Sequence, residues 1–401
     1  MTYYLLPKSS PLIYKYITCI EQESPPTPVI SNSLSEYLYE TKKKLDEREK
    51  DWDVFKKYTN PYEYIHTPIP FKKKCISKYK PLSRSYFKMI EMVNTFNLYY
   101  DNPIHSFHLA EGPGGFIEAM AGLRKCQNDT YIGMTIIDDN QDPNIPGWKK
   151  TESFLRQNKN VYIETASDKT GNILSLENLV YCKDKYASSM ELITGDGGFD
   201  FSMDFNNQEI HIAKLLFGQI AYAVTMQKKG GSFILKIFDS FMQHTIDLLY
   251  ILSSFYEKVY IIKPNTSRYA NSERYIVCKD FIFSSCEKFY PFIYKAFEKM
   301  LLVNEYIYRF LNIPISYFFI SKLEEYNAII GQQQIEIIHY TISLIENKHK
   351  QEKIDNLIRV NIQKCVQWCV KHNIPCNTIT NNTNIFTNQT FLELIEDNDI
   401  I

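Results

Sequence analysis

The sequence predicts an α/β fold in which one seven-stranded sheet carries helices on its faces and a helical region follows it. Between residues 61 and 285, short apolar runs alternate with helix-like segments, which is the pattern of a layered α/β domain. A glycine-rich turn over residues 111–116 joins an apolar run to a helical one, as in open α/β sheets that bind nucleotides. Beyond residue 285, glycines almost vanish and apolar residues recur at helical spacing.

These patterns divide the chain into four parts. We expect an N-terminal extension over residues 1–60 with a charged helical stretch at 36–57, the α/β domain over 61–285, a helical C-terminal domain over 286–376, and a loosely ordered, asparagine-rich tail over 377–401. The expected strands cover residues 107–110, 131–137, 161–165, 191–194, 232–238, 259–263 and 275–281. The expected C-terminal helices cover residues 289–310, 317–329, 334–346 and 354–372.

The composition indicates a folded protein with a large core and no overall attraction to nucleic acid. Of the 401 residues, 44% are hydrophobic and 14% are aromatic, which excludes general disorder. Because the formal net charge is -1, any affinity for a polyanion has to be local. No apolar run is long enough to span a bilayer. The nine cysteines are scattered and no signal peptide is visible, so we expect free thiols and a cytoplasmic location.

The turn that follows the first apolar run is the strongest local signal. Glycines at this point let the backbone approach a ligand closely, and the next helix aims its N-terminus at that ligand. The spacing differs from the G-x-G-x-x-G of dinucleotide-binding proteins, and a proline inside the turn fixes φ where that motif needs freedom. An ordinary tight connection between strand and helix is the alternative. The residues of the turn are Glu111, Gly112, Pro113, Gly114, Gly115 and Phe116.

Four further segments carry charged residues next to apolar runs. They are Ser-Arg-Ser-Tyr-Phe-Lys at 83–88, Thr-Gly-Asp-Gly-Gly at 194–198, Gly-Gly-Ser-Phe-Ile-Leu-Lys at 230–236, and Ser-Arg-Tyr-Ala-Asn-Ser-Glu-Arg-Tyr at 267–275. Taken singly, a lysine or a glutamate is usually a solvated side chain, and Asp-Gly-Gly is usually a turn. Lys236 is different because it ends a buried-strand pattern, where a charge needs a partner or a purpose.

Together these segments resemble, in the right order, the motifs of the FtsJ/RrmJ-type RNA 2′-O-ribose methyltransferases, and in particular their mRNA cap branch from eukaryotes and large DNA viruses. The resemblance implies the S-adenosylmethionine-dependent methyltransferase variant of the doubly wound fold, with the last strand antiparallel and paired to its predecessor through residues 265–273. It also implies that S-adenosylmethionine is the cofactor. The implied catalytic tetrad is Lys88, Asp196, Lys236 and Glu273.

The resemblance further implies roles for individual residues. Lys236 would remove the ribose proton or stabilise the developing alkoxide. Burial and Lys88 would favour its neutral form, whereas the carboxylates would favour its charged form, and the sequence leaves the outcome open. The mechanism needs no metal. The implied cofactor contacts are Glu111, Gly112, Pro113, Gly114, Gly115, Phe116, Asp168 and Asp196. Many family members carry an acidic residue at the position of His108, which we expect here to be a packed core histidine.

A basic segment next to Lys88 predicts a local RNA track. Basic groups beside rings that can stack on bases are what single-stranded RNA requires, and the rings here are Phe71, Tyr79, Tyr86 and Phe87. A solvated, lysine-rich stretch before a helix is the alternative. The predicted RNA-binding residues are Lys72, Lys73, Lys74, Lys78, Lys80, Arg84, Arg268 and Asn271.

One cluster of cysteines and a histidine near the end of the chain could be taken for a zinc site. Cys365, Cys369 and His372 would share one stripe of a helix, with Cys376 beyond Pro375. Four ligands from one helix are geometrically awkward, so packed cysteines are favoured and no metal is expected.

The sequence therefore predicts a methyltransferase that uses S-adenosylmethionine to modify a ribose 2′-hydroxyl in the 5′ cap region of mRNA. The alternatives are a ribosomal RNA enzyme of the same class, a catalytically silent RNA-binding or scaffold member, and an enzyme that methylates a small molecule or a protein. RNA is the expected partner, no membrane is expected, and a protein partner would dock on the helical C-terminal domain.

Overall fold

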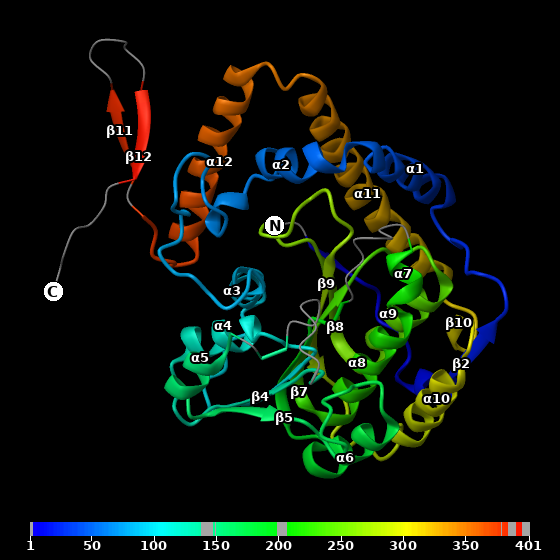
Figure 1. Cartoon of the computed structure of the whole chain (residues 1–401). Coiled ribbons are helices and arrows are strands. Elements are labelled where there is room, and N and C mark those ends of the chain that lie inside the picture. Colours follow the sequence, from blue (N-terminus) through cyan, green and yellow to red (C-terminus); the bar gives the residue numbers. More distant parts are fainter. Residues whose placement is uncertain are drawn as a thin grey trace.

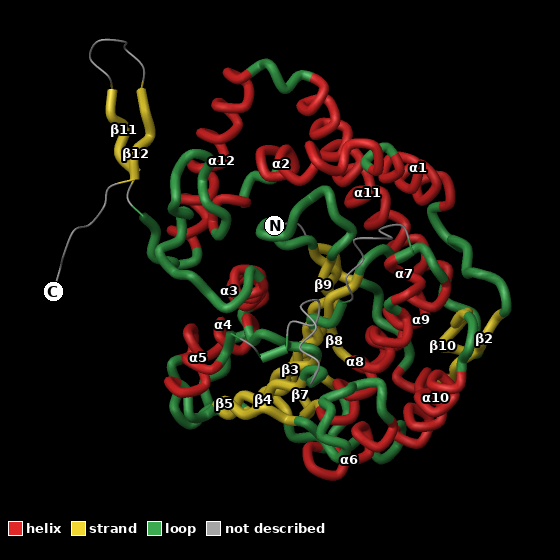
Figure 2. The backbone as a smooth tube through the Cα atoms, in the orientation of Figure 1, coloured by secondary structure: helices red, strands yellow, loops and turns green. Residues whose placement is uncertain are grey.

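The computed structural model describes residues 3–137, 147–148, 150–198, 207–377, 379–383 and 390–394. Its centre is an eight-stranded sheet with the order β1-β8-β9-β7-β6-β3-β4-β5 (Figures 1 and 2). The strands are β1 (Tyr3–Leu5), β3 (His105–Leu109), β4 (Thr130–Met134), β5 (Val161–Glu164), β6 (Met190–Gly195), β7 (Gln227–Ile237), β8 (Tyr256–Ile262) and β9 (Arg274–Phe281).

The sheet confirms the predicted topology and adds one strand to it. Strands β3 to β7 are parallel, while β9 runs antiparallel between β7 and β8. The seven expected apolar runs all form strands of this sheet. The prediction of seven strands was wrong at one edge, because β1 from the N-terminal extension pairs antiparallel with β8. A three-residue strand is too short to show an alternating pattern in the sequence.

Two hydrophobic cores lie on the two faces of the sheet. Successive strand residues point to opposite faces, so Leu192 and Ile234 join one core while Ile193 and Phe233 join the other. Helices α3 (Ser85–Phe96), α4 (Gly115–Arg124) and α12 (Gln351–Lys371) contribute to the first core. Helices α6 (Leu176–Tyr186), α8 (Ala213–Met226), α9 (Gln243–Phe255) and α10 (Tyr290–Leu302) contribute to the second. Figure 1 shows these two groups of helices on opposite sides of the sheet.

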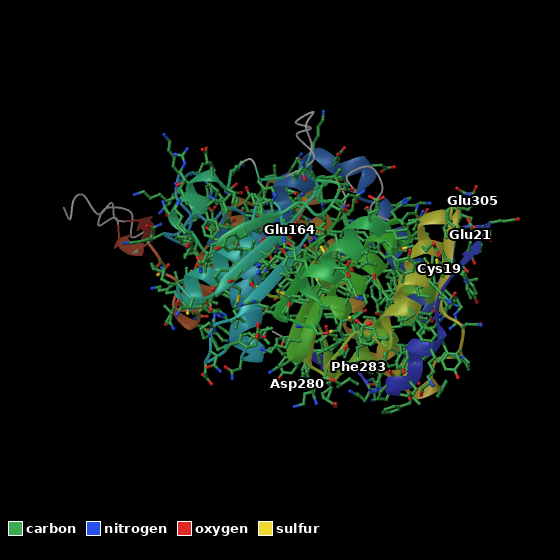
Figure 3. All side chains as sticks on the ribbon, turned by 90° about the horizontal axis from the view of Figure 1, so that it is seen from below. Cys19, Glu21, Glu164, Asp280, Phe283 and Glu305 are labelled. Atoms are coloured by element: carbon green, nitrogen blue, oxygen red, sulfur yellow. The ribbon has the colours of Figure 1, made fainter. Side chains whose placement is uncertain are left out.

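The N-terminal extension packs on the region that follows the sheet in the sequence. Strand β2 (Ile17–Gln22) pairs antiparallel with β10 (Tyr306–Leu311), and the Glu21 carboxylate accepts hydrogen bonds from the backbone N–H groups of Asn304 and Glu305 (Figure 3). The helices α1 (Asn32–Lys43) and α2 (Glu49–Thr59) contact α11 (Tyr317–Glu346). The remaining short elements are η1 (Pro11–Tyr16), η2 (Asp46–Arg48), η3 (Glu63–Ile65), α5 (Glu152–Gln157), α7 (Gln208–His211), β11 (Ile379–Thr383) and β12 (Thr390–Leu394).

Three helix predictions need correction. The expected helix over residues 289–310 ends at Leu302 and is followed by β10, whose tyrosines and Phe310 suit a strand as well as a helix. The two expected helices over 317–346 are one helix, α11, because Gly331 does not break it. A Cβ on Gly331 would lie 2.8 Å from Cδ2 of Leu34, so the glycine lets α1 pack closely. The charged stretch over 36–57 forms two helices, α1 and α2, separated by η2.

No helix in the described part of the chain is both long enough and apolar enough to cross a membrane. Part of the predicted tail over 377–401 lies outside the described residues, which include β11 and β12 there.

Candidate active site

The candidate site lies where neighbouring parallel strands end side by side. Leu109 of β3 pairs with Gly195 of β6, and Gly195 pairs with Leu235 of β7. Open α/β sheets bind ligands at this carboxyl edge. The antiparallel β9 brings Tyr275 opposite Lys236. Asp196 and Lys236 directly follow two of these positions, and Glu111 follows Leu109 by two residues.

The turn after β3 depends on glycine for close packing. Gly114 has a φ of 108°, a conformation that L side chains rarely adopt. A Cβ on Gly112 would lie 2.6 Å from the carbonyl oxygen of Gly147, and a Cβ on Gly115 would overlap the hydroxyl of Ser83. The glycines therefore let the turn lie directly against the segment that leads into α3.

Glu111 caps the helix that follows this turn. Its Oε1 accepts hydrogen bonds from the backbone N–H of Phe116 at 2.7 Å and of Ile117 at 3.1 Å, which satisfies donors that the first turn of a helix leaves unpaired. The ring of Phe116 is fully buried and packs beside Tyr275. Phe116 therefore presents its backbone at the turn, while its ring belongs to the core.

Burial first, and then the nearby charge of Asp196, raise the pKa of Glu111 to about 8, although the hydrogen bonds from the helix and the charge of Lys236 oppose this rise. Two carboxyl groups thus lie close together where little water reaches them, so it is unfavourable for both to be ionised at once. A bound cation would relieve this repulsion.

The four residues of the predicted tetrad come together in two ion pairs. Lys88 Nζ, on α3, lies 2.6 Å from Oε1 of Glu273. Lys236 Nζ lies 3.3 Å from Oδ1 of Asp196 and donates to the backbone oxygen of Asp196 at 2.7 Å. All four side chains are largely but not fully buried, with between 9% and 16% of each exposed. Residues far apart in the sequence therefore form one compact charged cluster.

Tyr275 links the two ion pairs, and sequence reasoning gave it no role. Its hydroxyl donates to Oδ1 of Asp196 at 2.8 Å and accepts a hydrogen bond from Lys88 Nζ at 3.4 Å. Glu273 and Tyr275 are two residues apart at the start of β9, so their side chains lie on the same face of the sheet. This spacing of two residues could have indicated that Tyr275 lies beside Glu273. A tyrosine within an apolar strand pattern, however, is usually interpreted as a core residue.

The neighbours of Glu273 keep it charged. Burial alone would raise its pKa, yet the cations of Lys88, Lys236 and Lys263 hold the pKa well below its usual range. Ser267 also donates its hydroxyl to Oε1 of Glu273 at 2.6 Å. Burial lowers the pKa of Lys88, and the carboxylates of Glu273 and Asp196 oppose that effect.

Lys263 is a second residue that the sequence did not single out. Its ammonium donates at 2.6 Å to the backbone oxygens of Asn271 and Glu273 and to Oδ1 of Asn271. This lysine therefore holds the part of the β8–β9 loop that directly precedes Glu273 in the sequence. Asn271, which the sequence assigned to RNA binding, is exposed but uses its side-chain oxygen in this contact.

Asp168 lies in the loop after β5 and is exposed. Its Oδ1 accepts hydrogen bonds from the backbone N–H of Thr170 at 2.9 Å and from Nδ2 of Asn178 at 2.9 Å. These contacts shape the loop itself, and the role of Asp168 toward a cofactor stays a prediction.

The predicted RNA segment is only partly an exposed surface. Lys73, Lys78 and Lys80 are exposed, while Lys72 and Lys74 are half-buried. Lys72, Lys74 and Lys78 each have an interaction partner. The expectation that four rings could stack on bases was wrong for two of them, because Tyr86 and Phe87 are buried in the core under α3. The other two rings, Phe71 and Tyr79, are exposed.

Arg84 and Arg268, which the sequence assigned to RNA binding, both form contacts within the protein near the β8–β9 loop. Arg268 forms a two-pronged contact with the fully buried Glu63, at 2.6 Å from Nη2 and 3.0 Å from Nε. Burial alone would raise the pKa of Glu63, but Arg268 and Arg84 hold it well below its usual value. Arg84 donates to the backbone oxygen of Thr266 at 2.9 Å. Both arginines thus anchor the β8–β9 loop, and their contact with RNA stays a prediction.

The histidine and cysteine expectations are confirmed by packing. His108 is fully buried, with its ring nitrogens 2.8 Å from Oγ1 of Thr194 and 2.9 Å from Oγ of Ser106, and burial lowers its pKa to about 3. Cys365 and Cys369 are fully buried in the core around α12. Within the described residues, no group of three or more His, Cys, Asp or Glu side chains could hold a metal ion.

A mostly parallel sheet with one antiparallel strand, a glycine turn after its central strand and an ionic cluster at its carboxyl edge defines a class of α/β proteins that bind a nucleotide-type cofactor. Residues 81–281, half of the chain, match the FtsJ-like methyltransferase family. The chain therefore belongs to this family.

Several curated proteins are similar to this chain. The "Cap-specific mRNA (nucleoside-2'-O-)-methyltransferase 2" of Pongo abelii is 27% identical over 384 residues, which cover 88% of this chain and 48% of that protein. The "Cap-specific mRNA (nucleoside-2'-O-)-methyltransferase 1" of Trypanosoma brucei brucei is 31% identical and covers 47% of this chain and 52% of its own length. The "Probable methyltransferase EP424R" of African swine fever virus is 28% identical, covering 60% and 56%. The chain thus spans about half the length of these relatives.

The raised pKa of Glu111 predicts a measurable pH dependence of stability. Between the usual pKa of a glutamate and about 8, the folded protein keeps a proton that the unfolded chain releases, so this contribution to stability is lost as the pH rises. A Glu111→Gln variant mimics the protonated form. Its melting temperature relative to the wild type should therefore increase from pH 5 to pH 8, with a slope of at most about 1.4 kcal/mol per pH unit in the free energy of unfolding. Parallel melting curves for the two proteins across this range would contradict the assignment.

Proposed function

We propose that this chain transfers a methyl group from S-adenosylmethionine to a ribose 2′-hydroxyl of RNA, in the 5′ cap region of mRNA. The observation that carries the proposal is the pairing of Lys88 with Glu273 and of Lys236 with Asp196 at the carboxyl edge of the sheet, in a chain of the FtsJ-like family. The names of the cap-specific relatives support the substrate. Ribosomal RNA is the nearest alternative within the class.

The residues at the turn fit the charge of the proposed cofactor. S-adenosylmethionine carries a sulfonium and an amino group, both cationic. Burial and the charge of Asp196 raise the pKa of Glu111, and a cation bound beside these two carboxyl groups would favour the charged form of Glu111. Gly112, Gly114 and Gly115 supply a backbone without side chains at the same turn. Asp196 would hold the amino group, and the backbone of residues 112–116 would pass under the methionine part.

The chain has to align the ribose oxygen and handle its proton. When bound, the cofactor supplies a methyl group on a sulfonium, which is a good leaving group. Lys236 would hydrogen-bond to the 2′-hydroxyl. It would either take the proton itself or, as a cation, stabilise the alkoxide while the proton passes to water as the hydroxyl oxygen attacks. Asp196 keeps the Lys236 amine in place through the contacts at 3.3 Å and 2.7 Å. Lys88, held by Glu273 and next to Tyr275, adds positive charge beside the same oxygen.

The exposed lysines before α3 would guide the RNA. Lys73, Lys78 and Lys80 are exposed, as are the rings of Phe71 and Tyr79. All of them precede Lys88 in the chain by at most 17 residues. Phosphate contacts and base stacking from such a segment would lead a single strand to the ionic cluster.

We also propose a protein partner for the helical C-terminal part. At the start of α11 the side chains of Tyr317 and Phe318 are 82% and 61% exposed, and exposed aromatic rings are common in protein interfaces. The cytoplasm is the proposed place of action, because all nine cysteines are free thiols, which suits a reducing compartment.

Two alanine variants should separate cofactor binding from chemistry. Asp196→Ala should lose both affinity for S-adenosylhomocysteine, measured by calorimetry, and turnover. Lys236→Ala should keep that affinity within about twofold and lose turnover by about 10²–10⁴-fold. Turnover is measured as tritium transfer from labelled S-adenosylmethionine to capped and uncapped RNA.

The matched control is Lys229→Ala, an exposed lysine at the other end of β7, which should leave turnover unchanged. Wild-type protein that binds the cofactor product but labels neither RNA would favour the silent, scaffold-type alternative. Unchanged turnover in Lys236→Ala would remove this lysine from the reaction.

The RNA track predicts a salt-dependent effect. Replacing Lys73, Lys78 and Lys80 together by glutamine should weaken RNA binding and lower the slope of log affinity against log salt by up to about three, because each phosphate contact contributes about one. The control triple variant changes Lys125, Lys159 and Lys229, which are exposed near the opposite edge of the sheet. Equal slopes in the two triple variants, measured by fluorescence anisotropy, would move the RNA track elsewhere.

A further inference from the structure

A buried polar network lies behind the ionic cluster, on the other face of strand β9. Arg274 stands between Glu273 and Tyr275 in the sequence, so strand alternation turns its side chain away from theirs. The side chain is fully buried. Its Nη2 lies 3.2 Å from Oδ1 of Asp239, and its guanidinium lies 5.4 Å from the ring centre of Tyr326. Arg274 therefore anchors the strand end that carries two residues of the site.

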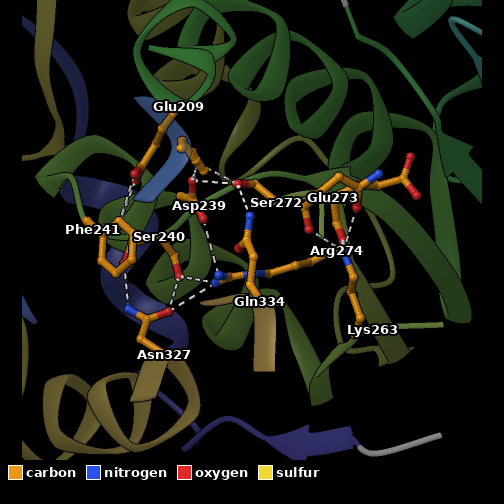
Figure 4. Close-up of polar contacts among 12 residues, drawn as sticks. Glu209, Asp239, Ser240, Phe241, Lys263, Ser272, Glu273, Arg274, Asn327 and Gln334 are labelled. Atoms are coloured by element: carbon orange, nitrogen blue, oxygen red, sulfur yellow. Dashed lines mark hydrogen bonds and ion pairs between the residues drawn. The ribbon is translucent and has the colours of Figure 1, made fainter. Parts of the chain in front are cut away.

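Asp239 connects this anchor to the strand that carries Lys236. It follows Lys236 by three residues, at the end of β7. While Oδ1 faces Arg274, Oδ2 accepts a hydrogen bond from the hydroxyl of Ser272 at 2.7 Å (Figure 4). Oδ2 also accepts one from Nζ of Lys42 at 3.1 Å. Burial alone would raise the pKa of Asp239, but Lys42 and Arg274 lower it. One carboxylate thus joins the ends of β7 and β9.

Lys42 reaches this network from outside the family domain. It lies in α1 of the N-terminal extension, and the family match begins at residue 81. Its ammonium contacts both Asp239 and Ser272, the latter at 2.9 Å, and only 10% of its side chain is exposed. Ser272 directly precedes Glu273. A lysine from α1 therefore holds the side chain of the residue next to Glu273, the partner of Lys88.

The C-terminal extension contributes from α11. Asn327 donates to the backbone oxygen of Ser240 at 2.9 Å and accepts from Arg274 at 3.1 Å. Gln334 donates to the backbone oxygen of Ala270 at 3.1 Å and to Oγ of Ser272 at 3.3 Å. Figure 4 shows Asn327 beside the guanidinium end of Arg274 and Gln334 pointing toward Ser272.

We infer that Lys42 is a positioning residue for methyl transfer, which locks the β7 and β9 ends through Asp239 and Ser272 and thereby sets the distance between the Lys88–Glu273 and Lys236–Asp196 pairs. The inference rests on the proposed function. A displacement of about 1 Å in a catalytic group can cost about 100-fold in rate, so a lock of this kind matters even though Lys42 lies behind the strands and outside the ionic cluster. The two extensions are thereby part of the machinery that shapes the site.

Lys42→Met is the variant that tests this lock with the least damage to the fold. It removes one of the two cations that contact Asp239 and leaves the other, Arg274, so the buried carboxylate keeps a partner. Single-turnover methylation of capped RNA should slow by about tenfold or more, while affinities for S-adenosylhomocysteine and for RNA stay within about twofold of the wild type. Lys42→Arg should restore most of the rate, because it keeps the cation and its donors.

A second measurement does not depend on activity. Lys88 is 93% buried and held by Glu273, so its acylation by an excess of an amine-reactive ester, followed by mass spectrometry, should be slow in the wild type. Lys42→Met should make Lys88 react several-fold faster, because the start of β9 is no longer held. Ser272→Ala, which keeps all charges, should change labelling and rate in the same direction.

Lys44→Met is the matched control, since Lys44 is an exposed lysine directly after α1 and its loss removes the same charge. It should change neither the rate nor the labelling of Lys88. Unchanged rate and labelling in Lys42→Met would overturn the inference. If the wild type methylates no RNA, the proposed function fails, and the labelling of Lys88 alone then decides whether Lys42 positions the cluster.

Discussion

The constraint on which the rest of the structure depends is the neutralisation of charges brought together at the edge of a buried sheet. Taking a lone charge out of water is costly, whereas paired and hydrogen-bonded charges are tolerated. Here Lys88 faces Glu273, Lys236 faces Asp196, and the hydroxyl of Tyr275 joins the two pairs. Each pair joins residues far apart along the chain, so the cluster exists only when the strands are in register.

The arrangement of charges also separates two tasks of the site. On the side of the glycine turn, two carboxyl groups form the first zone, where burial and the charge of Asp196 raise the pKa of Glu111 to about 8. On the side of β9, lysines surround Glu273 and hold its pKa low. A cationic methyl donor suits the first zone, and an oxygen that loses its proton suits the second. The in-line geometry of methyl transfer needs such zones next to each other.

Much of this could be predicted from the sequence, and the misses have physical reasons. The strands were visible as apolar runs, and the four charged residues were assigned because the motifs that carry them resemble those of a known family in the same order. Tyr275 and Arg274 were missed because an aromatic or a single arginine in a strand pattern gives no sign of its partners. Lys42 looked like a solvated residue in a charged helix, since its partner Asp239 is 197 positions away. The rings of Tyr86 and Phe87 were misassigned because α3 is buried on nearly all sides.

The central claim is that Lys236 and its partners handle the proton of a ribose hydroxyl. The most direct test is a crystal structure with S-adenosylhomocysteine and a short capped RNA. We expect a ribose 2′-oxygen within about 3 Å of Nζ of Lys236. The cofactor sulfur should lie in line with this oxygen, beyond the position that the methyl group would occupy. A bound RNA whose 2′-oxygens all lie away from Lys236, or a cofactor product outside the turn over residues 111–116, would contradict it.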